Sequence, residues 1–285
     1  ERSGPKYLPH NRGFDYFKGF LHGAIDYVTH ERKDLGEIDW QRNGETLKET
    51  GFTTDLLADD AVRMLKSRDK SRPVFLYLPF NAVHGPLSVP PGSNLDRRDR
   101  RRILLANVTY MDAAIGRVLK TIDSEGLREN TLVLFLSDNG GQLSQGASNE
   151  PWRGEKGTVF EGGIHTPAIV RFPGVIKAGS KSGQVVSVID WFPTLATAAG
   201  VKPGNTAPFD GRDLWSYIRD GKTTPPENLV IAQGGVAILH GPWKLVNGSD
   251  QKAEKGGKGG AKGGGAAAKK ARPAQKKGNA AENTR

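Results

Sequence analysis

The sequence contains no cysteine among its 285 residues. This absence excludes disulfide bonds, thiolate metal sites and a cysteine nucleophile within the chain. Long apolar runs are also missing. None approaches the ~20 residues that a membrane-spanning helix requires, so no membrane association is predicted. With 36% hydrophobic and 25% charged residues, the chain has enough apolar side chains for the core of a large α/β domain.

The formal net charge of +10 is distributed unevenly along the chain. Residues 251–285 carry ten basic and two acidic side chains, whereas the rest is nearly neutral, with 31 basic and 29 acidic residues. Specific nucleic-acid binding is therefore not predicted. The tail, residues 251–285, lacks aromatic and large aliphatic side chains, so it cannot offset the entropy cost of ordering and is predicted to be disordered. It is either a solvated extension or a weak binder of polyanions through counterion release.

Two helix–strand units are predicted in the first half of the chain. An apolar stripe with helical spacing follows Thr53 and Thr54, which are suited to cap the helix N-terminus. A second stripe extends over residues 101–122. Each stripe precedes a short apolar run, Val74–Leu78 and Thr131–Leu136, that fits a strand buried on both faces. The spacing predicts two parallel strands joined by a right-handed crossover.

The second half of the chain has shorter elements. Residues 167–172 predict a third strand, and residues 190–199 and 213–219 predict short helices. Three runs separated by Gly-Gly and Gly-Pro predict a small antiparallel appendage, at residues 229–233, 236–240 and 243–246. We therefore divide the chain into a main domain (1–222), a small antiparallel piece (223–250) and the tail (251–285).

Two polar segments directly follow predicted strands, where ligands bind in parallel α/β sheets. Asp138 and Asn139, before two glycines, offer a carboxylate and an amide oxygen, which are hard donors suited to Ca²⁺ or Mg²⁺. The same residues are also ordinary turn formers. His84 lies in the loop after the other strand and is either a general acid or a structural histidine.

A third polar segment contains a lysine between glycines. In Arg-Gly-Glu-Lys-Gly-Thr, Lys156 lies between Gly154 and Gly157, and flanking glycines let an ammonium group approach an anion with little obstruction. The alternative is an exposed turn. The segment is not a phosphate-binding P-loop, because the glycine and lysine spacing of that motif is absent.

Several segments, taken in order, resemble the sulfatase family, in particular arylsulfatase B-like enzymes. The resemblance covers roughly residues 1–250, and the metal and lysine segments are the specific ones. The segments are RGFDYFKGFLHGAIDYVTHER, FLYLPFNAVHGPLSVP, LFLSDNGGQ, PWRGEKGTVFEGGIHTPAIVRFPG, DWFPTLATAAG and DGRDLWSYI.

The resemblance implies an alkaline phosphatase-like α/β fold, a mixed sheet flanked by helices. It further implies that Asp138 and Asn139 ligate calcium, that Lys156 contacts the sulfate, and that His84 assists the leaving-group oxygen. His84 and Lys156 would thus be both catalytic and substrate-binding. The implied substrates are sulfated sugars or aryl sulfates, and the implied location is periplasmic or secreted.

The family's nucleophile is a formylglycine made from Cys or Ser in a [CS]-x-P-x-R motif, which this sequence lacks. Its three Ser-x-Pro segments, at Ser3, Ser71 and Ser88, have no arginine at the required position. We therefore expect a chain truncated at its N-terminus that is inactive alone. The alternatives are a phosphodiesterase or phosphonate hydrolase of the same superfold, or a protein that binds polyanions through its tail. Asn139 argues against the first, because related phosphatases have a zinc-binding histidine there.

Overall fold

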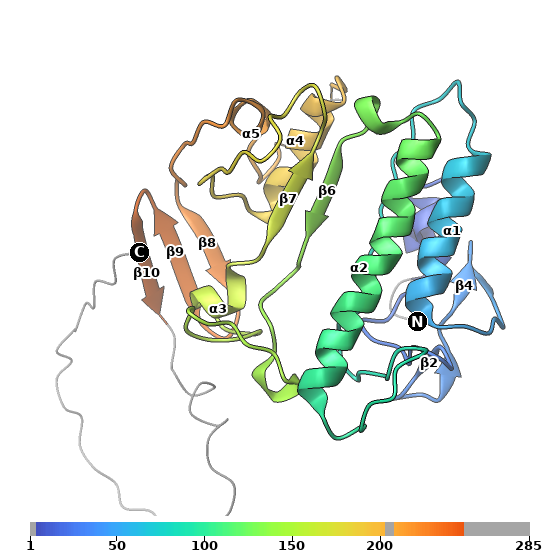
Figure 1. Ribbon diagram of the computed structural model, residues 1–285. Coiled ribbons are helices and arrows are strands. Elements are labelled where there is room, and N and C mark those ends of the chain that lie inside the picture. The colour runs from blue at the N-terminus through green and yellow to red at the C-terminus, as the bar shows by residue number, and fades with distance from the viewer. Residues whose placement is uncertain (1–3, 203–207, 248–285) are drawn as a thin grey trace, which may run out of the picture. The chain divides into compact units, whose positions relative to one another are not determined.

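The computed structural model describes residues 4–202 and 208–247, which form two compact units. The first comprises residues 4–131 and 144–147, and the second comprises 132–143, 148–202 and 208–247. Figure 1 colours the chain from blue at the N-terminus to red at the C-terminus. In these ranges no helix combines the length and apolar character needed to cross a membrane.

The first unit is built around two helices that pack against each other, α1 (Thr53–Ser67) and α2 (Arg100–Ser124). Both confirm the helices predicted from apolar periodicity. Both helices have buried apolar side chains: Leu57, Ala58, Ala61 and Leu65 of α1, and Ile103, Leu104, Ala114, Val118 and Ile122 of α2. Arg117 of α2 also pairs with Asp55 of α1 at 2.8 Å.

Short strands and turns precede α1. Strands β1, β4 and β5 form one antiparallel sheet, and β2 pairs with β3. The bounds are β1 (Lys18–Gly19), β2 (Glu31–Arg32), β3 (Glu37–Ile38), β4 (Gln41–Arg42) and β5 (Glu45–Thr46). Single 3₁₀ turns are η1 (Pro5–Tyr7), η2 (Pro9–Asn11) and η3 (Arg128–Asn130), and η4 (Leu143–Gln145) lies where the chain passes from the second unit to the first.

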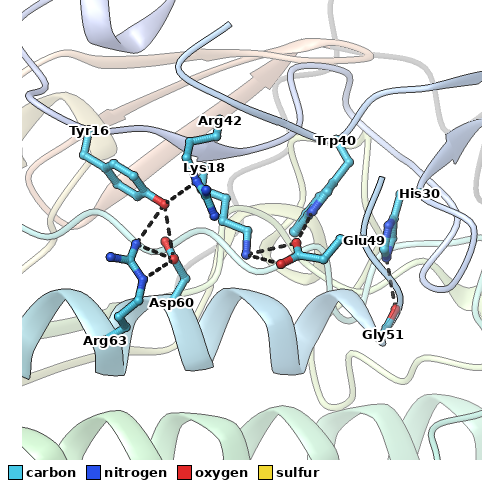
Figure 2. A network of polar contacts seen from close by, with 9 residues as sticks. All are labelled: Tyr16, Lys18, His30, Trp40, Arg42, Glu49, Gly51, Asp60 and Arg63. Atoms are coloured by element: carbon cyan, nitrogen blue, oxygen red, sulfur yellow. Dashed lines mark hydrogen bonds and ion pairs between the residues drawn. The ribbon is translucent and has the colours of Figure 1, made fainter. Parts of the chain in front are cut away.

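A partly buried polar network, drawn in Figure 2, stabilises this N-terminal segment. The Lys18 side chain is only 5% exposed and pairs with Glu49 at 3.0 Å, and Trp40 Nε1 donates to Glu49 Oε2 at 2.7 Å. Burial raises the pKa of the Glu49 carboxyl, but the hydrogen bonds from Trp40 and Lys18 outweigh it and hold the pKa below its usual value. Trp40 also forms an apolar cluster with Ile25 and Leu57 of α1, which ties the segment to the helix.

The capping role predicted for Thr53 and Thr54 is wrong. The helix N-cap is Phe52, and no side chain caps it. Thr53 is fully buried, and its hydroxyl donates to Asn81 Oδ1 at 2.8 Å. The Thr53 hydroxyl therefore bonds to a side chain distant in sequence instead of to the backbone at the start of the helix. Tertiary packing determines this choice, and the local sequence does not show it.

The strand predicted at Val74–Leu78 is not formed. These residues lie in no ladder, so the predicted parallel pairing with Thr131–Leu136 is not made. They are also not buried on both faces, since Phe75 and Tyr77 are each 69% exposed. Only Leu78 at the end of the run packs against the Trp40 cluster. An apolar run forms a strand only where another strand accepts its hydrogen bonds, which this part of the described chain lacks.

The second unit contains β6 (Val133–Leu136) and β7 (Ala168–Arg171), which pair antiparallel along their whole length. Both strands were predicted, but not their mutual pairing. Helix α3 (Glu161–Ile164) lies between them in sequence. The 3₁₀ turn η5 (Val188–Asp190) leads into α4 (Trp191–Ala198), and α5 (Trp215–Asp220) follows, near the predicted bounds.

The antiparallel appendage is confirmed as a sheet. Strands β8 (Leu229–Ala232), β9 (Val236–His240) and β10 (Trp243–Asn247) form the order β10–β9–β8. Ala237 and Leu239 of β9 are its buried side chains. The domain boundary at residue 222 stays a prediction, and the tail, residues 251–285, lies outside the described residues.

Candidate active site

The Asp138–Gly141 loop begins where β6 ends at Leu136. Asp138 is exposed and Asn139 is half-buried. Gly140 N donates to Gly163 O at 2.9 Å, and a Cβ at Gly140 would lie 1.8 Å from Gly162 O. Only glycine therefore permits this approach of two backbones. The Asp138 carboxylate and Asn139 amide make no hydrogen bond with residues 4–202 or 208–247, which leaves their oxygens available.

The lysine loop, Arg153–Gly157, packs against the same backbone. Lys156 N donates to Gly141 O at 3.2 Å. Gly154 and Gly157 have φ of 91° and 87°, a left-handed conformation that lets the loop turn sharply on both sides of the lysine. Lys156 is half-buried, and across the described part of the chain its ammonium has no hydrogen-bond or ion-pair partner. The loop that carries an unpaired ammonium therefore contacts, through its backbone, the loop that carries unpaired oxygen donors, which suits the binding of an anion and a cation.

Asn149 joins these two loops through its side-chain amide. Its Oδ1 accepts from Gly141 N at 2.8 Å, and its Nδ2 donates to Gly141 O at 2.8 Å and to Gly154 O at 3.1 Å. One side chain therefore sets the spacing between the Asp138–Gly141 loop and the lysine loop. Sequence reasoning missed Asn149, because an asparagine that binds backbone groups has no diagnostic spacing.

Asn149→Asp tests this connection with almost no change in shape. The carboxylate keeps the acceptor for Gly141 N but faces two carbonyl oxygens without a proton to donate. We expect a loss of about 1–2 kcal/mol in unfolding free energy at neutral pH, measured by denaturant titration. Repulsion by the carbonyls raises the folded-state pKa of the new carboxyl. The loss of unfolding free energy relative to wild type therefore becomes smaller as falling pH protonates that carboxyl. Asn130→Asp, at an exposed site, is the control. An equal, pH-independent effect in both variants would contradict the role of Asn149.

His84 belongs to the first unit and is exposed. Its backbone N donates to Asn81 O at 2.7 Å, and its Nδ1 lies 2.6 Å from Gly85 O. A carbonyl oxygen can only accept, so Nδ1 carries a hydrogen. The opposite nitrogen, Nε2, is then an acceptor in the neutral ring and a proton donor in the charged ring. This geometry suits general acid–base chemistry at Nε2.

Tyr27, which sequence reasoning also missed, is hydrogen-bonded to the backbone of the His84 loop. It is 1% exposed, and its hydroxyl lies 2.9 Å from both Asn81 O and His84 O. Burial raises the pKa of Tyr27, so the hydroxyl stays protonated and able to donate. Asn81 is in turn held by Thr53. Tyr27 lies in the aromatic segment quoted above, but nothing in that segment indicates its distant partner.

Tyr27→Phe is expected to cost about 1–3 kcal/mol of unfolding free energy, because the one hydroxyl hydrogen that the Asn81 and His84 carbonyls share is lost. The measurement is a denaturant or thermal midpoint compared with wild type. Tyr77→Phe removes an exposed hydroxyl from the same unit and should cost little. If the two variants are equally stable, the Tyr27 hydroxyl does not hold the loop.

The candidate residues are thus divided between the units. Asp138, Asn139 and Lys156 lie together in the second unit, whereas His84 lies in the first. Among the described residues no group of three or more His, Cys, Asp or Glu side chains is arranged to hold a metal ion.

Comparisons with known proteins show the family of the chain. A family model described as Sulfatase matches residues 1–201, and the chain belongs to the sulfatase family. Mouse arylsulfatase J is 33% identical over 233 residues, which cover 78% of this chain and 39% of that protein. Dog N-acetylgalactosamine-6-sulfatase is 32% identical over 77% of this chain and 45% of its own length.

Among solved structures, Ps i-CgsB in complex with k-i-k-neocarrahexaose is similar, with a TM-score of 0.76 and 29% identity. The match covers 86% of this chain and 60% of that chain. It confirms the predicted alkaline phosphatase-like α/β class. The chain spans less than half the length of the two curated relatives.

Proposed function

We propose that this chain is part of a calcium- and formylglycine-dependent sulfatase that hydrolyses sulfate monoesters. The observation that carries the proposal is the joining of the Asp138–Gly141 loop to the Lys156 loop through Asn149. That junction links the loop with the unpaired carboxylate and amide oxygens to the loop with the unpaired ammonium, groups that suit a cation and a sulfate. Family membership supports the same reaction.

The donor set fits calcium better than zinc. Asp138 and Asn139 would hold the ion through a carboxylate and an amide oxygen, which are calcium ligands, whereas zinc prefers imidazole and thiolate. Calcium bound there would supply positive charge opposite the sulfate oxygens, and formylglycine would supply the nucleophile. No [CS]-x-P-x-R motif occurs in these residues, so the nucleophile would come from a segment outside this chain.

The remaining roles belong to two side chains of this chain. Lys156 would direct its ammonium at the sulfate oxygens on which negative charge develops in the transition state. His84, with Nδ1 bonded to Gly85 O, would hold a proton on Nε2 and transfer it to the departing alcohol oxygen. The substrate would be a sulfated sugar or an aryl sulfate. Sulfated carbohydrates are supported by the names of relatives, such as N-acetylgalactosamine-6-sulfatase.

Two alternative functions can be distinguished from this proposal by simple measurements. A phosphodiesterase or phosphonate hydrolase of the same superfold would turn over phosphate esters in preference to sulfate esters. A polyanion-binding protein would lose heparin affinity when the basic side chains of the tail, residues 251–285, are replaced. The oxygen donors at Asp138 and Asn139 favour the sulfatase, because an imidazole at the second position would suit zinc and phosphoryl transfer.

The calcium site gives a direct test of the proposed function. Calcium takes six to eight oxygen ligands, so two side chains should bind it weakly, with a Kd of about 10⁻³ M or higher. Calorimetry on the isolated chain should show this weak binding disappear in Asp138→Ala and persist in Asp210→Ala, which removes another exposed carboxylate of the same unit. Tight calcium binding that survives Asp138→Ala would overturn the assignment.

A further inference from the structure

An exposed aromatic pair lies beside the proposed sulfate site in the second unit. The rings of Trp152 and His165 stack with centroids 4.7 Å apart and an interplanar angle of 27°. Trp152 is 46% exposed and the His165 side chain 53%. The two stacked rings remain about half exposed and present a flat surface to solvent. An exposed surface of large rings is a candidate binding site.

A polar chain fixes the orientation of the histidine. His165 Nδ1 lies 3.2 Å from Glu161 Oε2, and Glu161 Oε1 accepts from Lys244 Nζ at 2.6 Å. The Lys244 side chain is only 11% exposed, so Glu161 is held from the protein side. The Nδ1 that faces the carboxylate carries a hydrogen. His165 Nε2 makes no hydrogen bond with the described residues and stands free beside the tryptophan.

Both rings are attached to the backbone of the proposed site. Glu161 begins α3, and the next two residues, Gly162 and Gly163, are those against which Gly140 packs. On the other side, Trp152 N donates to Asn149 O at 2.8 Å, and the Asn149 side chain binds Gly141. Asn149 and the start of α3 therefore contact both the stacked pair and the Asp138–Gly141 loop.

We propose that Trp152 and His165 form a binding surface for a pyranose ring of the substrate. The axial C–H face of a pyranose stacks on an aromatic ring, while its hydroxyls need a hydrogen-bond partner at the ring's edge. The exposed Trp152 ring supplies the first feature, and His165 Nε2 supplies the second. The inference rests on the proposed sulfatase activity and deepens it, since it selects sulfated carbohydrates over simple aryl sulfates.

The test compares substrates on the protein that carries its nucleophile segment. The sugar substrates are monosulfated galactose, glucosamine and fucose. The comparison substrate is para-nitrophenyl sulfate, whose ring has no free hydroxyl. Trp152→Ala should raise KM for the best sugar sulfate about tenfold with little change in kcat, because stacking stabilises bound substrate and transition state alike. Trp152→Phe keeps an aromatic face and should recover most of the loss.

His165→Phe separates sugar recognition from stacking alone. It keeps an aromatic ring against Trp152 but has no nitrogen, so KM should rise for the sugar sulfate and stay within about twofold for para-nitrophenyl sulfate. Unchanged KM for the sugar sulfate in Trp152→Ala, equal effects of His165→Phe on both substrates, or turnover of the aryl sulfate alone would each overturn the inference. Turnover of neither substrate class by the wild-type protein would instead overturn the proposed function.

Discussion

Lys156→Ala should lower kcat/KM for a sulfate ester on the order of 10²-fold in the protein that carries its nucleophile segment. The Lys156 ammonium has no partner among the described residues, so its charge is available to the sulfate oxygens as the transition state forms. Removing a charge directed at a developing oxyanion typically costs about 3 kcal/mol in the barrier. The same replacement should change unfolding free energy by under about 0.5 kcal/mol, because the ammonium loses no hydrogen bond or ion pair to the described residues.

The matched control is Lys181→Ala, which removes an exposed lysine from the same unit. It should leave both kinetics and melting temperature unchanged. If Lys156→Ala also leaves kcat/KM unchanged, the lysine is an ordinary turn residue and the proposed sulfate contact is wrong. If it lowers the melting temperature along with the rate, its role is structural.

The second large effect concerns the chain by itself. The isolated chain should show no turnover of an aryl sulfate above a buffer blank, with or without added calcium. A covalent nucleophile divides a difficult reaction into two easier steps, and none of the [CS]-x-P-x-R kind occurs in this sequence. Lys156 and His84 alone stabilise charge and move a proton, but neither attacks sulfur in the proposed mechanism.

The measurement is a continuous assay of para-nitrophenyl sulfate with rigorously purified chain. The same chain carrying Lys156→Ala controls for contaminating sulfatases, whose activity the substitution cannot affect. Turnover in the wild-type chain that disappears in Lys156→Ala would show that the chain holds its own nucleophile, contrary to the proposal.

The elements with strong apolar periodicity could be predicted from the sequence. The stripes that became α1 and α2 have a long helical period, and β8–β10 are short runs separated by glycines, so local pattern is sufficient. The run Val74–Leu78 has equally strong strand composition, yet it pairs with nothing in the described chain. Whether this run forms a strand depends on a partner strand elsewhere. The residues of the run itself do not indicate whether such a partner is present.

Candidate site residues could be proposed from the sequence only where residue type carries the chemistry. Asp138, Asn139 and Lys156 could be proposed because oxygens, an ammonium and flanking glycines limit what a loop can bind. Asn149 and Tyr27 could not, because each acts through hydrogen bonds to the backbone of distant residues. Thr53 shows the same limit: its sequence position predicts a helix cap, whereas its hydroxyl binds Asn81.

Sulfuryl transfer at Asp138, Asn139 and Lys156 is tested most directly by comparing two esters on the protein that carries its nucleophile segment. The measurement is kcat/KM for para-nitrophenyl sulfate and para-nitrophenyl phosphate under identical conditions with calcium. Because an amide oxygen at Asn139 suits calcium rather than zinc, we predict a higher kcat/KM for the sulfate ester, lost in Asp138→Ala. A higher kcat/KM for the phosphate ester would contradict the proposed function and assign the site to phosphoryl transfer.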